Sequence, residues 1–433
     1  MLFKNESIKI SLRIKRQNPK DINKSMNCSA ILVDYVKLFL NILRSIHYLI
    51  KIITFNFSKI LNMQLSFWEI KNWFSNVDFT IVGSGIVGIH CALTLRERFP
   101  QAKILILERG VLPQGASTKN AGFACFGSIS EIIDDLKSHS EEEVMQLVQK
   151  RWAGLQLLRK NVGDSHLDFK PYGGYELFLK EDENLYHECL QKLPFVNELL
   201  KPLFKTDVFA REMDRFDFKG IHEYLIFNPF EAQIDTGNMM QFLLQKAAAA
   251  GILILNQMEV KNHVDTGTQV EIELDHFSFI TQKLIFTTNG FAGPLTRNEV
   301  KPARAQVLIT EPIPDLDIRG TFHLDRGYYY FRNFENRILL GGERNLDFEG
   351  ETTTELEITE KIQHRLDYLL KEVILPGKTV EIAHRWSGIM GIGNSKSPII
   401  EQLSNNTFCG VRMGGMGVAI GSLVGKELAE IIT

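Results

Sequence analysis

The chain has 433 residues, of which 44% are hydrophobic and 23% charged, and its net charge is −3. This length fits two domains or one large two-lobed one, and the composition is that of an ordinary soluble globular protein. The near-neutral charge argues against a nucleic acid partner. Five scattered cysteines without a C-x-x-C pair argue against a zinc site or a disulfide framework and fit a reducing compartment, so we expect no metal and a cytoplasmic location.

Residues 1–62 form a basic N-terminal extension with 11 Lys or Arg against 3 Asp or Glu. Charged residues interrupt the apolar stretch 31–61, so no uncharged run approaches the roughly 18 to 20 residues of a membrane-spanning helix. Three interpretations stay open: a basic amphipathic helix that contacts an anionic membrane through residues 31–62, a cleaved targeting segment, and an extension without a folded role. We favour the last, because Met63 would be a comfortable start for the domain that follows.

The first motif is the stretch "FTIVGSGIVGIHCAL" at residues 79–93. Gly83, Gly85 and Gly88 have the spacing G-x-G-x-x-G between a β-branched run and a helix-like pattern from Ile86 to Arg96. The first two glycines let the backbone turn and approach a pyrophosphate, and the third lets helix and strand pack closely. We therefore expect phosphates at the N-terminus of this helix.

A second strand, Lys103–Leu107, ends in Glu108 about 20 residues after the last glycine. At this place a carboxylate accepts hydrogen bonds from an adenosine ribose, and it would repel a phosphate there, which disfavours NADP. The small-residue segment "RGVLPQGASTKNAGFACFGS" follows, and its position places it over the cofactor cleft. Together these features predict an adenine dinucleotide site.

Further along, a helix closed by Gly251, the strand 252–255 and the strand 284–288 ending at Asn289-Gly290 continue the α/β pattern. Between these pieces lie strand-like segments that we expect to form a separate antiparallel sheet. They are 173–179, 304–310, 328–334 and 337–343.

The C-terminal stretch "FCGVRMGGMGVAIGSLVGKELAEIIT" predicts a strand to Cys409, a glycine-rich turn over Gly410–Gly417 and a helix from Val418. A second helix N-terminus at a flexible turn suits the edge of a ring that becomes anionic on reduction. One turn for a pyrophosphate and another for such a ring favour FAD over NAD.

The motifs "GSGIVG", "LERG", "GASTKNAGFA", "TTNGFAG", "HRWSGIMG" and "GGMGVAIGSLVGKELAEII", in this order over residues 77–433, resemble the D-amino acid oxidase family of FAD-dependent oxidoreductases. The resemblance implies an α/β fold, a Rossmann-like FAD-binding domain with an inserted antiparallel-sheet (α+β) substrate domain. The FAD-binding domain would comprise 77–165, 230–300 and 385–433, and the substrate domain 166–229 and 301–384. It also implies oxidation of a C–N bond of an amine or amino acid, with oxygen or another electron acceptor completing the cycle.

The resemblance further implies a set of FAD contacts. These are Gly83, Ser84, Gly85, Ile86 and Gly88 at the pyrophosphate, Glu108 and Arg109 at the adenosine, Ser117, Thr118, Asn120, Ala121 and Gly122 along the ribityl chain and flavin, Val260 at the adenine, Gly290 at its strand end, and Gly415, Met416, Gly417 and Val418 at the pyrimidine edge.

Substrate recognition departs from the family pattern. In glycine oxidase-like members a W-x-G-x-R segment supplies an arginine for the substrate carboxylate, whereas this chain has Trp386 followed by Met390 in the place of that arginine. A larger or less acidic amine is therefore expected. Candidates for substrate contact are Trp386, Met390, Arg304 as a relocated clamp, and Tyr328 with Tyr330, which would share one strand face.

Two other classes of function stay open at this point. An NAD-linked dehydrogenase would account for the first glycine motif and Glu108 but not for the C-terminal turn. A non-catalytic flavin-binding protein would keep the cofactor without turnover.

Overall fold

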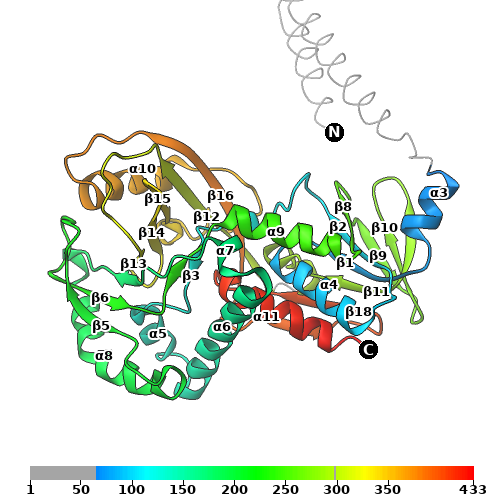
Figure 1. Cartoon of the computed structure of the whole chain (residues 1–433), viewed down its shortest axis with the longest axis horizontal. Coiled ribbons are helices and arrows are strands. Elements are labelled where there is room, and N and C mark those ends of the chain that lie inside the picture. The colour runs from blue at the N-terminus through cyan, green and yellow to red at the C-terminus, as the bar shows by residue number, and fades with distance from the viewer. Residues whose placement is uncertain (1–64, 297–298) are drawn as a thin grey trace, which may run out of the picture. The chain divides into compact units, whose positions relative to one another are not determined.

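The structure is a computed structural model that describes residues 65–296 and 299–433 (Figure 1). The predicted extension, residues 1–62, lies outside the described residues. The chain divides into Met1–Met63 and Gln64–Thr433, and the second unit carries two eight-stranded sheets. Within 65–296 and 299–433 no helix has the length and apolar character needed to cross a membrane.

The first sheet has the strand order β17-β18-β11-β1-β2-β8, with the hairpin of β9 and β10 attached to β11. Strands β18, β11, β1, β2 and β8 run parallel to one another. The strands are β1 (Val77–Val82), β2 (Ile104–Glu108), β8 (Leu253–Asn256), β9 (Asn262–Asp265), β10 (Val270–Glu273), β11 (Ser278–Phe286), β17 (Ile399–Gln402) and β18 (Thr407–Val411). A parallel sheet whose strands alternate with helices agrees with the Rossmann-like α/β domain predicted from the sequence.

Helices bury one face of this sheet. They are α4 (Ile86–Arg98), α6 (Glu141–Val162), α9 (Thr236–Ala249) and α11 (Gly417–Glu430). The core between them takes Ile81 from β1 and Ile106 from β2, both with no exposed surface. Side chains of the other face cluster with the β9–β10 hairpin and with Phe74. Because both faces are covered, β2 is a continuous apolar run from Ile104 to Leu107 instead of an alternating one.

The second sheet has the order β16-β12-β15-β14-β13-β4-β6-β5 and is antiparallel except for the pair β4–β13. Its strands are β4 (Gly174–Glu176), β5 (Ala210–Met213), β6 (Tyr224–Asn228), β12 (Lys301–Thr310), β13 (Thr321–Leu324), β14 (Tyr329–Phe334), β15 (Arg337–Gly342) and β16 (Ile382–Ile392). Helix α10 (Glu360–Tyr368) and the π-helical turn η7 (Leu369–Ile374) cover one face.

 The apolar side chains of η7 join those of α10 in the core of this sheet.

The predicted antiparallel sheet is thus confirmed, with one correction to its extent. The expected domain boundary at residue 385 falls inside β16, whose residues pair with β12 from Ile382 to Ile392. The segment 385–392 therefore belongs to the second sheet, because its hydrogen-bond partners lie there. The wider assignment of segments to two domains stays a prediction.

The remaining helices, turns and short strands complete the described part of the chain. They are α3 (Phe67–Glu69), η1 (Ile70–Phe74), η2 (Ala116–Thr118), β3 (Phe123–Ala124), α5 (Ile129–Asp135), α7 (Asp164–Leu167), η3 (Lys180–Asp182), α8 (Glu183–Phe204), β7 (Ala232–Gln233), η4 (Asn289–Phe291), η5 (Pro294–Thr296) and η6 (Arg344–Leu346). Strands β3 and β7 pair with each other. Serine caps begin α5 and α6, where Ser128 and Ser140 each accept a hydrogen bond from the amide of a glutamate three residues on.

Candidate active site

A cavity of about 820 Å³ is lined by residues from both sheets. Its volume falls within the range of small-molecule and cofactor sites. Most of the residues predicted from the sequence line it. These are Gly83, Gly85, Ile86, Glu108, Arg109, Ser117, Asn120, Ala121, Gly122, Val260, Gly415, Met416, Gly417 and Val418 from the predicted cofactor set, and Tyr328, Tyr330 and Met390 from the predicted substrate set.

The N-terminus of α4 opens into this cavity. Gly83 has φ +107°, a backbone conformation that favours glycine, and a Cβ at Gly88 would lie 2.0 Å from the Gly83 carbonyl oxygen. The amide of Ile86 donates to the Ser117 hydroxyl at 3.0 Å. The turn therefore brings backbone amides and the helix dipole to the cavity wall, as an anion site requires.

Glu108 ends β2 and is 5% exposed. Its carboxylate accepts hydrogen bonds from the amide and hydroxyl of Ser84, at 3.1 and 2.8 Å, and from the amide of Gly110 at 3.0 Å. The segment that follows β8 lies beside Glu108, because the amide of Met258 donates to the Glu108 carbonyl oxygen at 2.9 Å. Val260 follows on the cavity wall. Such a corner suits an adenosine, with a fixed carboxylate for the ribose.

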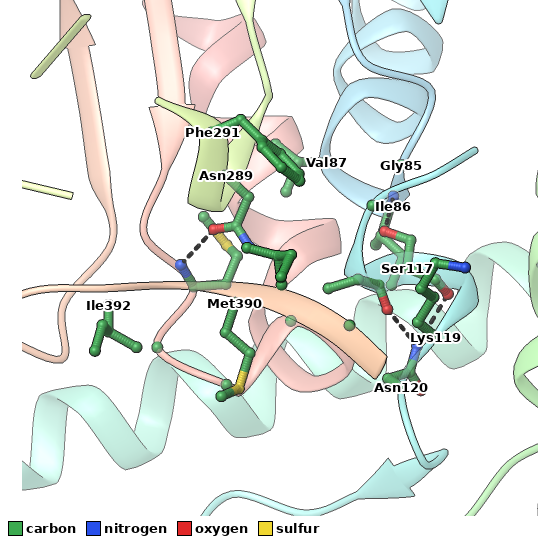
Figure 2. Close-up of a pocket in the computed structure, with 18 of the residues that line it drawn as sticks. Gly85, Ile86, Val87, Ser117, Lys119, Asn120, Asn289, Phe291, Met390 and Ile392 are labelled. Carbon is green, nitrogen blue, oxygen red and sulfur yellow. Dashed lines mark hydrogen bonds between the residues drawn. The ribbon is translucent and has the colours of Figure 1, made fainter. Parts of the chain in front are cut away.

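The loop that contains η2 forms another wall. The Asn120 side-chain amide donates to the Ser117 carbonyl oxygen at 2.9 Å, and its oxygen accepts from the amide of Gly122 at 2.9 Å. Figure 2 shows Ser117, Lys119 and Asn120 on one side of the pocket, and Met390 and Asn289 on the other. The loop is thereby held in one conformation without a regular ladder of backbone bonds.

The N-terminus of α11 also reaches the cavity, after a turn in which Gly415 has φ +82°. A Cβ at Gly415 would lie 3.4 Å from the Met390 sulfur. The side chain of Asn289 accepts a hydrogen bond from the amide of Met413 at 3.1 Å, which fixes the turn from the other side. Two helix N-termini and one buried carboxylate thus border a single cavity.

Six predicted residues lie outside the cavity lining, namely Ser84, Gly88, Thr118, Gly290, Trp386 and Arg304. Ser84 and Gly88 serve the α4 turn as described above. The indole nitrogen of Trp386 donates to the Lys119 carbonyl oxygen at 3.0 Å, so this side chain supports the η2 loop from behind. A Cβ at Gly290 would lie 2.5 Å from the Met390 carbonyl oxygen, which makes its role one of close packing.

The prediction that Arg304 replaces the missing carboxylate clamp is wrong. Its side chain is buried and pairs with Glu351 through two hydrogen bonds, Nε to Oε2 at 2.8 Å and Nη2 to Oε1 at 2.9 Å. Both groups lie away from the cavity lining. Because the guanidinium already binds the Glu351 carboxylate in a bidentate manner, it does not bind a substrate carboxylate in the cavity.

Tyr328 and Tyr330 line the cavity together, as predicted, while Tyr329 packs into the core of the second sheet. Burial raises the pKa of Tyr330 to about 12. The Tyr330 ring meets Phe123 edge to face, with centroids 5.5 Å apart. This part of the cavity is therefore apolar, with phenolic groups as its polar points.

Sequence reasoning missed several lining residues, among them Phe123, His323 and Arg344. Phe123 and Lys119 were within a quoted motif, so the motif could have flagged them. His323 lies in β13 among apolar residues, where a lone histidine was the only signal. Arg344 follows β15 and carries no local signal, because only the strand pairing brings it to the cavity.

His323 forms a buried ion pair with Glu231, with 2.8 Å between Nε2 and Oε2. Burial alone would lower the pKa of His323, but the Glu231 carboxylate raises it to about 9. Cys125 completes a group of three whose ligand atoms lie within 4.8 Å of one another. Burial raises the pKa of the Cys125 thiol well above its ordinary value, which disfavours the thiolate that a metal would need.

The fold and cavity define a dinucleotide-binding α/β protein with a second sheet over the binding site. The chain belongs to the FAD-dependent oxidoreductase family, whose model matches residues 78–431. FAD is therefore the cofactor, which decides against the NAD-linked alternative. The cradle fits this group, because the α4 turn, the Glu108 corner and the α11 turn each supply what one part of a flavin dinucleotide needs.

Individual relatives are distant. The chain is 20% identical over 380 residues to the probable oxidoreductase OrdL of Haemophilus influenzae, with 82% of this chain and 83% of the relative covered. It is 21% identical over 376 residues to gamma-glutamylputrescine oxidoreductase of Escherichia coli, with the same coverage. Among solved structures, glycine oxidase from Geobacillus kaustophilus matches with a TM-score of 0.65 and 18% identity, covering 82% of this chain and 94% of that one.

Proposed function

We propose that the chain oxidises a C–N bond of an amine that is larger or less acidic than a simple α-amino acid. The observation that carries this proposal is Met390, which lines the cavity where glycine oxidase-like sequences of the family have an arginine. A thioether makes no charge-assisted hydrogen bond to a carboxylate. The similarity to gamma-glutamylputrescine oxidoreductase supports an amine substrate.

The residues that would hold FAD are those of the α4 turn, the Glu108 corner, the η2 loop and the α11 turn. When bound, FAD supplies a two-electron acceptor that takes a hydride from the carbon bearing the nitrogen at flavin N5. The amine loses a proton from nitrogen, and the imine hydrolyses in water. The chain's part is to place that carbon and to keep the reacting face dry.

The lining side chains suit orientation better than base catalysis. Tyr330 and His323 have pKa values of about 12 and about 9, raised by burial and by the Glu231 carboxylate respectively, so both stay protonated at neutral pH. A protonated phenol donates hydrogen bonds but does not abstract a proton. Phe123 and Val307 add apolar surface that excludes water. The amine is therefore expected to enter in its neutral form.

An anaerobic stopped-flow panel tests the proposal. N-methylated amines and polyamine derivatives should bleach the flavin absorption faster than glycine or D-alanine. Faster reduction by glycine or D-alanine would show an amino acid oxidase and would overturn the amine proposal. If no amine or amino acid reduces the flavin, the alternative of a non-catalytic flavin-binding protein gains support.

A further inference from the structure

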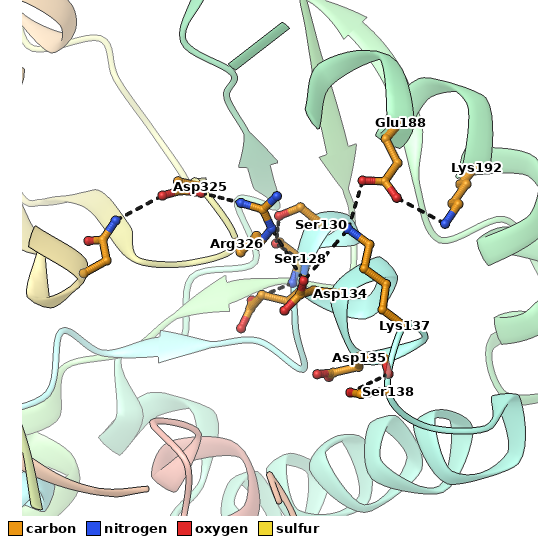
Figure 3. Close-up of polar contacts among 12 residues, drawn as sticks. Ser128, Ser130, Asp134, Asp135, Lys137, Ser138, Glu188, Lys192, Asp325 and Arg326 are labelled. Atoms are coloured by element: carbon orange, nitrogen blue, oxygen red, sulfur yellow. Dashed lines mark hydrogen bonds and ion pairs between the residues drawn. The ribbon is translucent and has the colours of Figure 1, made fainter. Parts of the chain in front are cut away.

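The cationic side chains on the cavity wall differ in whether a carboxylate already neutralises them. Lys396 pairs with Asp135, and Lys261 pairs with Glu259 and Asp275. Arg326 lies between Asp325, at 2.8 Å from its Nη1, and Asp134, at 3.6 Å from its Nε (Figure 3). Because carboxylates already neutralise these groups, they attract an anionic ligand less strongly than an unpaired cation does.

Arg344 is different. Within the described residues no carboxylate lies within 4.0 Å of its guanidinium, which instead lies 4.8 Å from the ring centre of Phe348 and 5.7 Å from that of Tyr328. Burial lowers the pKa of Arg344 from its ordinary value, but an arginine keeps its charge at neutral pH. A half-buried cation that faces a cavity without a carboxylate partner can be satisfied by an anionic ligand group.

Two turns place Arg344 beside Tyr328. The amide of Glu343 donates to the Tyr328 carbonyl oxygen at 2.9 Å, and the side chain of Asn345 donates to Asp325 at 3.1 Å. A Cβ at Gly342 would lie 2.0 Å from the Tyr328 carbonyl oxygen, so the two turns approach as closely as backbone allows. Glu343 itself takes a left-handed conformation, with φ +68°.

The Glu343 carboxyl does not act as the missing counter-ion. It is buried on the side of Arg365, whose Nε lies 3.6 Å from its Oε1. Desolvation raises the pKa of Glu343 to about 8, so the group is mostly neutral at pH 7. Glu343 therefore does not neutralise Arg344, whose positive charge faces the cavity.

We propose that Arg344, together with the Tyr328 hydroxyl, binds a carboxylate of the substrate. The planar guanidinium can take a carboxylate in a bidentate manner, and the phenol adds one donor. This proposal rests on the proposed function, in which the C–N bond of an amine is oxidised. It narrows the substrate class to amines that also carry a carboxylate. Two more lining cations, Arg109 and Lys119, have no carboxylate partner in the described segments. Arg109 stacks on Phe291 beside the Glu108 corner on the cofactor side, so Lys119 in the η2 loop is the competing position.

The direct test measures binding of an inert probe to the oxidised, FAD-loaded protein. Calorimetry with valerate, and with valeramide as its uncharged match, gives dissociation constants that do not depend on turnover. Arg344→Gln should raise the valerate constant about 10- to 100-fold and leave valeramide unchanged, since a hydrogen-bonded charge pair is lost. Arg344→Lys should fall between. Flavin content and thermal unfolding verify that each variant is folded.

Two control variants locate the effect. Arg326→Gln should leave the valerate to valeramide ratio as in the wild type, because its guanidinium is paired elsewhere. An unchanged ratio in Arg344→Gln, or a wild-type protein that does not distinguish valerate from valeramide, overturns the proposal. A loss in Lys119→Gln without one in Arg344→Gln also overturns it and moves the carboxylate to the η2 loop.

Anaerobic flavin reduction by 5-aminopentanoate and by pentylamine separates this proposal from the proposed function. The wild type should favour 5-aminopentanoate, and Arg344→Gln should remove that preference. If glycine or D-alanine reduces the flavin best and Arg344→Gln abolishes this, the carboxylate site stands while the amine proposal fails. If valerate binds through Arg344 but no amine reduces the flavin, only the proposed reaction is refuted.

Discussion

Glu231→Gln should remove a pH-dependent part of the protein's stability. The Glu231 carboxylate accepts hydrogen bonds from His323 Nε2 at 2.8 Å and from the Thr321 hydroxyl at 2.9 Å, and its side chain is 1% exposed. Glutamine keeps the shape of the side chain but removes its charge. The buried imidazolium of His323 then loses its hydrogen-bonded counter-ion, and Glu131 and Glu176 contribute less to its pKa, so the ring is expected to lose its proton.

The size of the effect follows from the pKa of His323, which rises from 6.5 to about 9 on folding, because the Glu231 carboxylate outweighs burial. At about 1.4 kcal/mol per unit, the shift corresponds to roughly 3 kcal/mol of stability. A raised pKa means that this stability is fully present below pH 6.5 and is lost as the pH rises through about 9. For a unit of about 370 residues, 3 kcal/mol corresponds to about 4 °C in Tm.

The assay is thermal unfolding of the FAD-loaded protein, followed by circular dichroism at pH 6 and at pH 10. Glu231→Gln should lower the Tm by about 4 °C at pH 6 and by clearly less at pH 10. Glu183→Gln is the matched control, because it removes a His–Glu pair on α8 whose side chains are 66% and 72% exposed. An exposed pair should change the free energy of unfolding by less than about 0.5 kcal/mol. An equal loss at both pH values, or none at pH 6, would refute the reasoning.

Three further predictions concern the FAD-binding turn, the Arg304–Glu351 pair and the N-terminal extension. Gly85→Val should abolish FAD retention, because a Cβ alone would lie 2.7 Å from the Ser117 hydroxyl oxygen; a folded variant with full yellow colour would contradict this. Arg304→Ala should lower the free energy of unfolding by about 3 to 5 kcal/mol, since it leaves Glu351 buried without its partner, while the preference among amine substrates stays as in the wild type. Protein that starts at Met63 should fold, retain FAD and turn over like the full chain, and an insoluble or flavin-free product would show that residues 1–62 are structural.

The cofactor half of the cavity could be predicted from the sequence because backbone geometry imposes residue identity there. The α4 turn needs glycine at Gly83 for its conformation and at Gly88 for the contact with the preceding carbonyl. A strand end before each turn fixes where the carboxyl edge of the parallel sheet lies. Such requirements are local, so they leave a pattern that can be read along the chain.

The substrate half could not be predicted in the same way. Arg304 lies within β12 and Arg344 follows β15 of the same antiparallel sheet, but Arg304 meets Glu351 whereas Arg344 faces the cavity. The difference depends on where the segment 350–359 folds back, and no local spacing encodes that. The sequence offered Arg304 as a replacement for the lost arginine of the W-x-G-x-R segment, and the pair with Glu351 shows that this choice was wrong.

The cofactor half and the substrate half of the cavity are lined by different kinds of groups. Backbone amides, glycines and one buried carboxylate form the FAD side, whereas Tyr328, Arg344 and Met390 project from strand ends and turns of the second sheet. A change of side chain at these three positions alters the charge that a substrate meets without touching the α4 turn or the Glu108 corner. Substrate class and cofactor retention should therefore be separable properties of this fold, and under the carboxylate proposal the position of the Arg344 guanidinium sets the substrate class.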